Sequence, residues 1–264
     1  MKDRLWELKQ AADGSGLELY IYGDVEGRTF DWENWRYVTS ENSAQHFREE
    51  LAKYPDAKRI DIYINSYGGD VFEGTAIYNQ LKRHQARKVV HVDGFACSIA
   101  SVIAMAGDEV IMPRNTLMMI HNMWVCACGN AAELRKAADD LDVINTAGRQ
   151  AYLQKAGDKL PEDQLAEMMD AETWLTAERC VELGLADRLA DEDADMSGAA
   201  AILQKVNASM EQRLQYQKVL AAQLRDLANV PAPGATPEAN PQGSGNPDKN
   251  KVLSLFAWGA KGER

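Results

Sequence analysis

The sequence predicts an α/β domain built on a largely parallel sheet. Between residues 17 and 190, short segments rich in β-branched and aromatic residues alternate with longer segments that carry apolar residues at helical spacing. In this order each helix connects two parallel strands and packs on the sheet. A chain of 264 residues with 45% hydrophobic and 26% charged residues has enough apolar content for one sizeable core.

The expected elements follow one another with short connections. Ser40 or Ser43 is predicted to cap the first helix, whose apolar residues Phe47 and Leu51 are spaced four apart. In order, the sequence predicts a strand at 17–25, a helix within 39–55, a strand at 58–66, a helix at 71–86, a strand at 87–94, a helix from Ser98, short strands within 108–121, a long helix at 131–157, and a helix and strand within 174–189.

Composition divides the chain into five segments. An N-terminal segment at 1–16 precedes the domain at 17–190, which ends at the acidic run DEDAD. Residues 199–229 carry apolar residues at alternating spacings of three and four, a pattern shared by coiled coils and by single amphipathic helices. Residues 230–250 hold five of the eight prolines and predict a disordered linker, and residues 251–264 form a mildly apolar tail.

The charge of the chain argues against two classes of partner. The formal net charge is −11 at pH 7. Phosphates of nucleic acids and anionic lipids repel such a chain, so we expect no nucleic-acid partner and no membrane partner. The longest apolar run, at 95–106, is too short to span a bilayer, and charges interrupt the N-terminus where a signal peptide needs an apolar stretch. We therefore expect a cytoplasmic protein.

The cysteines predict neither a disulfide framework nor a metal site. Cys97, Cys126, Cys128 and Cys180 are too few and too irregularly spaced for a disulfide scaffold in a chain of this length. The C-x-C sequence near His121 lacks the paired spacing of zinc motifs. We expect buried or incidental cysteines and no bound metal.

Two strand-to-helix junctions carry residues suited to chemistry. In INSYGGDV, Gly68 and Gly69 let the backbone turn tightly and present an N–H group with no Cβ in the way. Neither a P-loop lysine nor a G-x-G-x-x-G pattern follows, so the junction gives little support for a nucleotide site and leaves the role of an oxyanion donor open. In GFACSIAS, Ser98 opens a helix, where the N–H of Ile99 is placed to bind the oxyanion formed if Ser98 attacks a carbonyl.

A serine nucleophile needs a base, and the sequence offers few. His46 and His84 lie in polar helical patterns and His91 lies inside a strand. His121 ends an apolar strand before a loop, where a side chain can face a cleft. The residues alone leave two interpretations open: a catalytic pair of Ser98 and His121, or ordinary packing of small residues at the junction.

Four motifs in order resemble those of the Clp protease proteolytic subunit family. They are IYINSYGGDV, GFACSIASVIAMAG, LMMIHN and WLTAERCVELGLADRL, and they are most similar to the phage and prophage head-maturation branch. The similarity covers residues 17–189. It implies a crotonase-like fold of stacked ββα units and a serine endopeptidase that processes capsid or scaffold protein, in the host cytoplasm or within the procapsid.

The resemblance also implies roles for individual residues. Ser98 matches the nucleophile, His121 the general base, and the N–H groups of Gly69 and Ile99 the oxyanion donors. The reaction is acyl transfer and requires no cofactor.

The third member of the triad has two candidates. The family places an aspartate two residues before an aromatic residue, which corresponds here to Trp174, so Glu172 occupies that position. Asp170 keeps the residue type but shifts the register. Either carboxylate would orient the imidazole of the base.

The resemblance implies homo-oligomers, in rings of seven that stack in pairs as a tetradecamer. The helix at 131–156 is the expected stacking element. The segment at 1–16 does not resemble the hairpin with which housekeeping members contact an ATPase, so an unfoldase partner is left open. Tyr67 replaces the usual proline and IHNMW replaces IHQP, two departures close to the expected cleft.

Two other functions compete with the peptidase. A crotonase-fold acyl-CoA enzyme would use the same paired N–H groups on a thioester but needs no nucleophilic serine, so the Ser98–His121 pair argues against it. A capsid-assembly or scaffold component with a degenerate protease fold would have no chemical reason to keep Ser98, His121 and Gly69 together.

Overall fold

The described structure is a mixed α/β domain, which confirms the predicted class. The structure, a computed structural model, describes residues 6–11, 16–31, 36–40 and 43–194. The segments predicted at 199–229, 230–250 and 251–264 lie outside the described residues.

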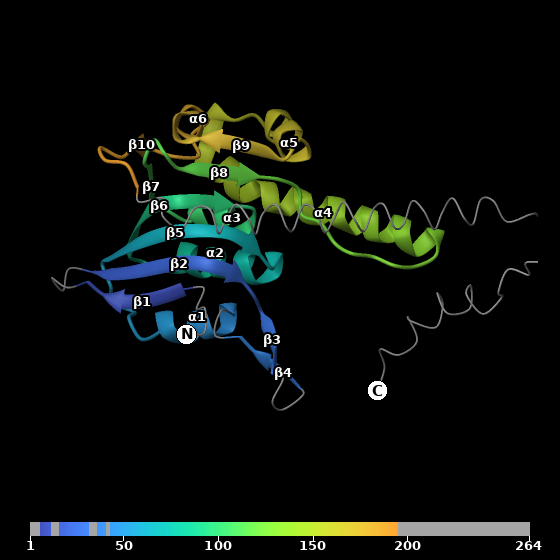
Figure 1. Cartoon of the computed structure of the whole chain (residues 1–264), viewed down its shortest axis with the longest axis horizontal. Coiled ribbons are helices and arrows are strands. Elements are labelled where there is room, and N and C mark those ends of the chain that lie inside the picture. The colour runs from blue at the N-terminus through green and yellow to red at the C-terminus, as the bar shows by residue number, and fades with distance from the viewer. Residues whose placement is uncertain (1–5, 12–15, 32–35, 41–42, 195–264) are drawn as a thin grey trace, which may run out of the picture. The chain divides into compact units, whose positions relative to one another are not determined.

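A single large sheet organises this part of the chain (Figure 1). Its strand order is β1-β2-β5-β6-β7-β10, with β8 beside β6 and β9 beside β8. All pairs are parallel except β1–β2 and β8–β9. The strands are β1 (Trp6–Gln10), β2 (Leu17–Val25), β5 (Arg59–Gly69), β6 (Arg87–Cys97), β7 (Glu109–Met112), β8 (Leu117–Ile120), β9 (Thr173–Thr176) and β10 (Arg188–Leu189), and β3 (Arg28–Asp31) pairs with β4 (Arg36–Thr39) in a separate hairpin.

The strand β6 pairs with two different strands along the same edge. Its first half pairs with β7, where Val90 lies beside Val110. Its second half pairs with β8, where Cys97 lies beside Met119. Because β8 follows β6 to its C-terminal end, the residues after both strands emerge together. This is the point at which the sequence places Ser98 and His121.

The helices begin at capping residues that the sequence provides. Ser43, one of the two predicted caps, accepts a hydrogen bond from the N–H of His46, and Asn130 forms a capping box with Glu133. The helices are α1 (Ala44–Leu51), α2 (Val71–Arg83), α3 (Ile99–Ala104), α4 (Ala131–Ala156), α5 (Glu162–Asp170) and α6 (Ala177–Glu182), with a 3₁₀ turn at Gly157–Lys159.

One face of the sheet forms the core and the other carries a row of aromatic rings. Alternate residues of β2 and β5, such as Leu19 and Ile62, are completely buried beneath the helices. On the opposite face the ring of Tyr63 stacks on those of Tyr20 and His91, with centroids 4.8 and 4.9 Å apart. The alternation follows from the period of two along each strand.

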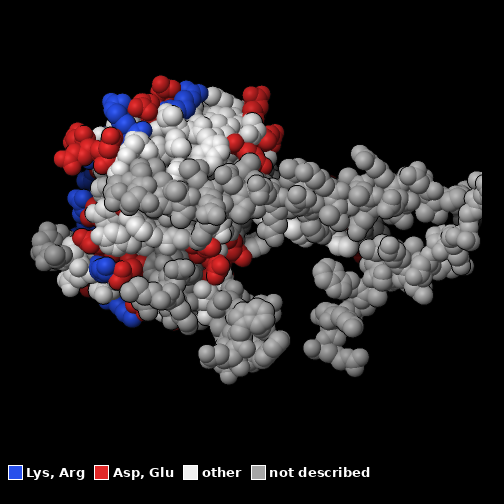
Figure 2. Space-filling view, in the orientation of Figure 1, with Lys and Arg blue, Asp and Glu red and all other residues white. Residues whose placement is uncertain are grey.

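Several charged side chains on the described surface form pairs of opposite sign. Glu109 lies between Arg87 and Arg188, at 2.7 and 2.9 Å. On the face shown in Figure 2, Lys and Arg are interspersed with Asp and Glu and form no continuous basic patch. Within the described ranges, no helix is both long and apolar enough to cross a membrane.

Two features extend the sequence-based prediction. The sheet begins at Trp6–Gln10, which pairs with β2, so the predicted N-terminal segment 1–16 contributes a strand to the domain. The helix α5 was not expected from the sequence.

The N-terminal half of α4 is largely exposed and runs past the sheet, with the loop that follows β8 beside it (Figure 1).

Candidate active site

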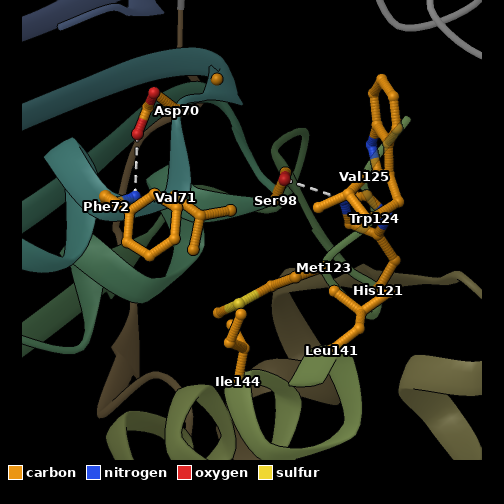
Figure 3. A pocket seen from close by; sticks show the side chains of 11 residues that line it. Asp70, Val71, Phe72, Ser98, His121, Met123, Trp124, Val125, Leu141 and Ile144 are labelled. Atoms are coloured by element: carbon orange, nitrogen blue, oxygen red, sulfur yellow. Dashed lines mark hydrogen bonds between the residues drawn. The ribbon is translucent and has the colours of Figure 1, made fainter. Parts of the chain in front are cut away.

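Strand pairing brings Ser98 and His121 together. The N–H of Ser98 donates to the carbonyl of Met119 at 2.8 Å, which extends the β6–β8 pairing by one bond. His121 immediately follows β8. Its Nε2 lies 2.7 Å from the Oγ of Ser98, within hydrogen-bond distance (Figure 3). Residues 23 positions apart in the sequence thus form the nucleophile–base geometry that serine peptidases need.

The backbone of Ser98 adopts a conformation that is rare for residues other than glycine. Its φ is 54° and its ψ is −130°, at the N-cap of α3. Such a conformation costs of order 1–3 kcal/mol and is maintained only by surrounding contacts. Ser98 makes no side-chain cap hydrogen bond to α3, so this turn presents its Oγ to the cleft and to His121.

A buried pair of hydroxyl groups supports this turn. The carbonyl of Ser98 accepts hydrogen bonds from the N–H of Ser101 at 3.0 Å and from its Oγ at 2.5 Å. The same Oγ lies 2.7 Å from the hydroxyl of Tyr152 on α4. Because Ser101 uses its single proton on the Ser98 carbonyl, Tyr152 is the donor to Ser101. Burial raises the pKa of Tyr152 and keeps this donor protonated.

The glycine pair lies directly against the nucleophile turn. A Cβ on Gly68 would come within 2.7 Å of the Cβ of Ser98 and 3.2 Å of the amide nitrogen of Ile99. A Cβ on Gly69 would come within 2.3 Å of the carbonyl of Val25. With φ values of 110° and 141°, both positions require glycine. Gly69 lines the same pocket as Ser98 and His121.

A buried serine fixes the strand end that carries these glycines. Ser66 is completely buried and accepts a hydrogen bond from the N–H of Gly68 at 3.1 Å. Its own hydroxyl donates to the carbonyl of Gly23 on β2. Ser66 therefore holds the glycine turn at the C-terminal end of β5 and links this strand end to the neighbouring strand β2.

Asp170 turns its side chain toward a residue other than His121. It lies at the exposed C-terminal end of α5 and accepts a hydrogen bond from the side-chain amide of Asn122 at 2.5 Å. This contact ties α5 to the segment that follows the base. Asp170 is therefore placed to position the loop, while its carboxylate already has a partner.

Glu172 immediately precedes the strand that pairs with β8. In the antiparallel pair β8–β9, Ile120 lies beside Thr173, so His121 and Glu172 are the next residues beyond the last pair of this ladder. Glu172 is half-buried and has a φ of 49°, and its N–H donates to the carbonyl of Met169 at 3.2 Å. The unusual backbone conformation lies at the turn between α5 and β9, next to the base.

The two buried thiols, Cys97 and Cys180, are not alternatives to Ser98 as nucleophile. Burial raises the pKa of Cys97 and of Cys180 to about 12, so both stay protonated near neutral pH. Cys126 and Cys128 are exposed on the loop before α4. In the described ranges, no three His, Cys, Asp or Glu side chains are grouped so that they could hold a metal ion.

The cleft beside Ser98 is lined mainly by apolar side chains. It encloses about 220 Å³ between the start of α2, the segment after His121 and the middle of α4 (Figure 3). Its apolar lining residues are Val71, Phe72, Met123, Trp124, Val125, Leu141 and Ile144.

The sequence alone does not indicate most of the residues that form this apolar wall. Leu141 and Ile144 belong to α4. The periodic pattern of that helix does not indicate which of its residues lie near Ser98, which is distant in the sequence. The segment IHNMW was noted as a departure from the family pattern, and its Met123 and Trp124 do line the cleft. Tyr152 carried no signal in the sequence.

Comparisons with known proteins agree with this geometry. The family model described as Clp protease matches residues 39–193. The ATP-dependent Clp protease proteolytic subunit 3 of Rhodococcus jostii is 30% identical over 145 residues, which cover 54% of this chain and 71% of that protein. The corresponding subunit of Pleurastrum terricola is 30% identical over 145 residues, 54% of this chain and 72% of that protein. The subunit of Deinococcus radiodurans is 28% identical over 144 residues, 53% of this chain and 69% of that protein.

The match covers more than half of the chain and includes both strand-to-helix junctions and the segment around His121. Members of this family form oligomeric rings and act on protein substrates. The α/β architecture described above is consistent with the crotonase-like fold of that family. This chain belongs to the Clp protease family of serine-type endopeptidases.

Proposed function

We propose that Ser98 and His121 cleave peptide bonds by acyl transfer. His121 takes the proton of the Ser98 hydroxyl while Oγ attacks the peptide carbonyl carbon. When the tetrahedral intermediate collapses, the C–N bond breaks and the amine leaves with the proton held by His121. A water molecule, deprotonated by His121, then attacks the acyl-enzyme; the C–Oγ bond breaks, the acid product leaves, and His121 returns the proton to Ser98 Oγ. The observation that carries this proposal is the 2.7 Å distance between Oγ and Nε2.

The remaining roles follow from the surroundings of this pair. The N–H groups of Gly69 and Ile99 stabilise the oxyanion, a role supported by the close approach of the glycine pair to Ser98 and the amide of Ile99. Glu172 orients the imidazole and stabilises its cation, a role supported by its place directly before Thr173, the strand partner of Ile120. Asp170 is the less suitable carboxylate, because it bonds to Asn122.

We further propose that the substrate is a phage or prophage head protein, either capsid or scaffold. The resemblance of the four motifs to the head-maturation branch supports this, and residues 199–264, which lie beyond the family match, offer a segment for contact with the capsid or scaffold. Assembly into heptameric rings, with the exposed N-terminal half of α4 as a contact between stacked rings, would enclose the active sites.

Processing of head proteins tests the substrate. Procapsids assembled with the wild-type chain should contain shortened capsid or scaffold protein by intact-mass spectrometry, and those assembled with Ser98→Ala only full-length protein. Full-length head proteins in both samples, from a wild-type chain that still hydrolyses peptides, would show that the substrate lies elsewhere. Loss of peptide hydrolysis as well would favour a scaffold component.

Deletion and light scattering test the assembly. Removing residues 199–264 should reduce incorporation into procapsids, and unchanged incorporation would contradict a contact through that segment. Size-exclusion chromatography with light scattering should give the mass of seven or fourteen subunits, whereas a monomer would contradict the ring.

A further inference from the structure

Two cavities meet at one shared wall beside the nucleophile. The first is the cleft of about 220 Å³ at Ser98, and the second, of about 640 Å³, lies between α2 and α4. The residues common to both linings are Val71, Phe72, Met123 and Ile144. The second cavity is apolar near this wall and ends among polar groups that include Asn79, Lys82 and Gln154.

Of these four shared residues, Met123 is the one on the loop that follows the base. Val71 and Phe72 belong to the first turn of α2 and Ile144 belongs to α4, so their backbones are part of helices. Figure 3 shows the Met123 thioether extending between Ser98 and α4, toward Ile144. A methionine side chain has three rotatable bonds and adapts to irregular spaces, so it is the component of the wall that can change shape.

The structure holds Met123 in place through its backbone and its side-chain end. Its N–H donates to the Oδ1 of Asn145 at 2.8 Å, and Asn145 is buried in α4, only 6% exposed. Its terminal methyl group rests on the backbone of α4 at Gly148, since a Cβ added there would lie 2.3 Å from Met123 Cε. Because Gly148 has no side chain, it leaves room for the terminal methyl group of Met123.

We propose that Met123 is a specificity-determining residue, because its side chain separates the cleft at Ser98 from the cavity between α2 and α4. With Met123 seated on Gly148, the cleft accepts compact apolar side chains beside the scissile bond and excludes long ones. Shortening Met123 joins the two cavities and lets a longer side chain pass toward the space beyond. This inference rests on the proposed function, because it needs Ser98 to be the nucleophile.

Two peptide substrates that differ in one residue test the proposal. The residue before the scissile bond is leucine in one and homophenylalanine in the other, and kcat/KM is measured for both. Met123→Ala should raise the ratio of homophenylalanine to leucine cleavage by about tenfold or more, the scale of one or two methylene groups in an apolar pocket. Gly148→Ala should lower that ratio, because its Cβ pushes the thioether back toward the cleft.

The double variant makes the test specific. If Gly148→Ala acts only through the methionine, Met123→Ala/Gly148→Ala should show the ratio of Met123→Ala alone. Val143→Ala is the matched control, since this residue is on α4, is 70% exposed and lines neither cavity, and it should leave the ratio unchanged.

Labelling by a small fluorophosphonate separates failure of the inference from failure of the proposed function. An unchanged ratio in a Met123→Ala protein that is still labelled on Ser98 would overturn the role of Met123 alone. Absence of labelling in the wild-type protein would overturn the proposed nucleophile, and the inference with it. If Met123→Ala is not labelled but the wild-type protein is, Gly148→Ala becomes the test of the proposal. An unchanged ratio of homophenylalanine to leucine cleavage in a labelled Gly148→Ala protein would also overturn the role of Met123.

Discussion

The hydroxyl pair beneath the nucleophile turn allows a prediction of both stability and activity. Ser101 and Tyr152 are 0% and 1% exposed, so neither hydroxyl can turn to solvent when its partner is removed. Ser101→Ala removes the acceptor of the Tyr152 O–H and one donor to the Ser98 carbonyl. A buried hydroxyl without its partner costs about 1–3 kcal/mol, which for a domain of this size lowers Tm by roughly 2–12 °C.

Removing the other hydroxyl of the pair, that of Tyr152, should cost less folding stability. Tyr152→Phe removes a donor but leaves Ser101 bonded to the Ser98 carbonyl at 2.5 Å. The expected loss is about 1 kcal/mol, the net value of a typical hydrogen bond. In the double variant no hydroxyl is left without a partner, so its cost should be no larger than that of Ser101→Ala alone, which corresponds to an interaction energy of at least about 1 kcal/mol.

Urea unfolding of the four proteins measures these differences, and peptide hydrolysis measures their effect on the turn. Ser101→Ala should lower kcat more than Tyr152→Phe, because only Ser101 contacts the Ser98 carbonyl directly. Stability losses that add within about 0.3 kcal/mol would refute the coupling between the two hydroxyls. Equal kcat values for Ser101→Ala and wild type would refute the support of the nucleophile turn.

Three further predictions address the carboxylates and the thiols. Glu172→Gln should slow fluorophosphonate labelling of Ser98 by about 100-fold or more, as expected when the group that orients the base is lost, while its matched control Asp170→Asn should stay close to wild type; the opposite ranking would make Asp170 the third triad member. Burial alone would raise the pKa of Asp108, but hydrogen bonds from the backbone and ammonium of Lys88 outweigh it and lower that pKa below 3.8, so the contribution of Asp108 is present above about pH 4 and is lost as pH falls through the folded-state pKa. Asp108→Asn should therefore lower Tm at pH 7 by an amount equivalent to about 1 kcal/mol, reduced by solvent screening since this side chain is 45% exposed, and the difference from wild type should shrink below pH 4; a difference that is constant with pH would contradict the ion pair. Iodoacetamide at pH 8 should modify the exposed Cys126 and Cys128 in the native protein and spare Cys97 and Cys180, whose pKa burial raises to about 12, and peptide mapping that finds Cys97 modified would contradict its burial.

Local patterns in the sequence predict the strands and helices that position the site. The strand at Leu17–Val25 matches its prediction, and β5 and β6 each run three residues further than predicted, into the two junctions. The continuation of β6 to Cys97 is what places Ser98 at its end. The cap of α1 is Ser43 rather than Ser40, because Ser43 reaches the N–H of His46.

Features that depend on contacts between distant segments could not be predicted from these patterns. β6 pairs first with β7 and then with β8, and this second pairing decides that His121 meets Ser98. The positive φ of Ser98 is maintained by Met119 and Ser101, contacts visible only after folding. The strand at Trp6–Gln10 depends on β2 as its partner and has little apolar pattern of its own.

Labelling of the assembled protein by a fluorophosphonate, with the adduct located by peptide mass spectrometry, tests whether Ser98 is an activated nucleophile. We expect a single adduct on Ser98 that is absent from Ser98→Ala and strongly reduced in His121→Ala. An adduct on another residue, or equal labelling in wild type and His121→Ala, would contradict this expectation.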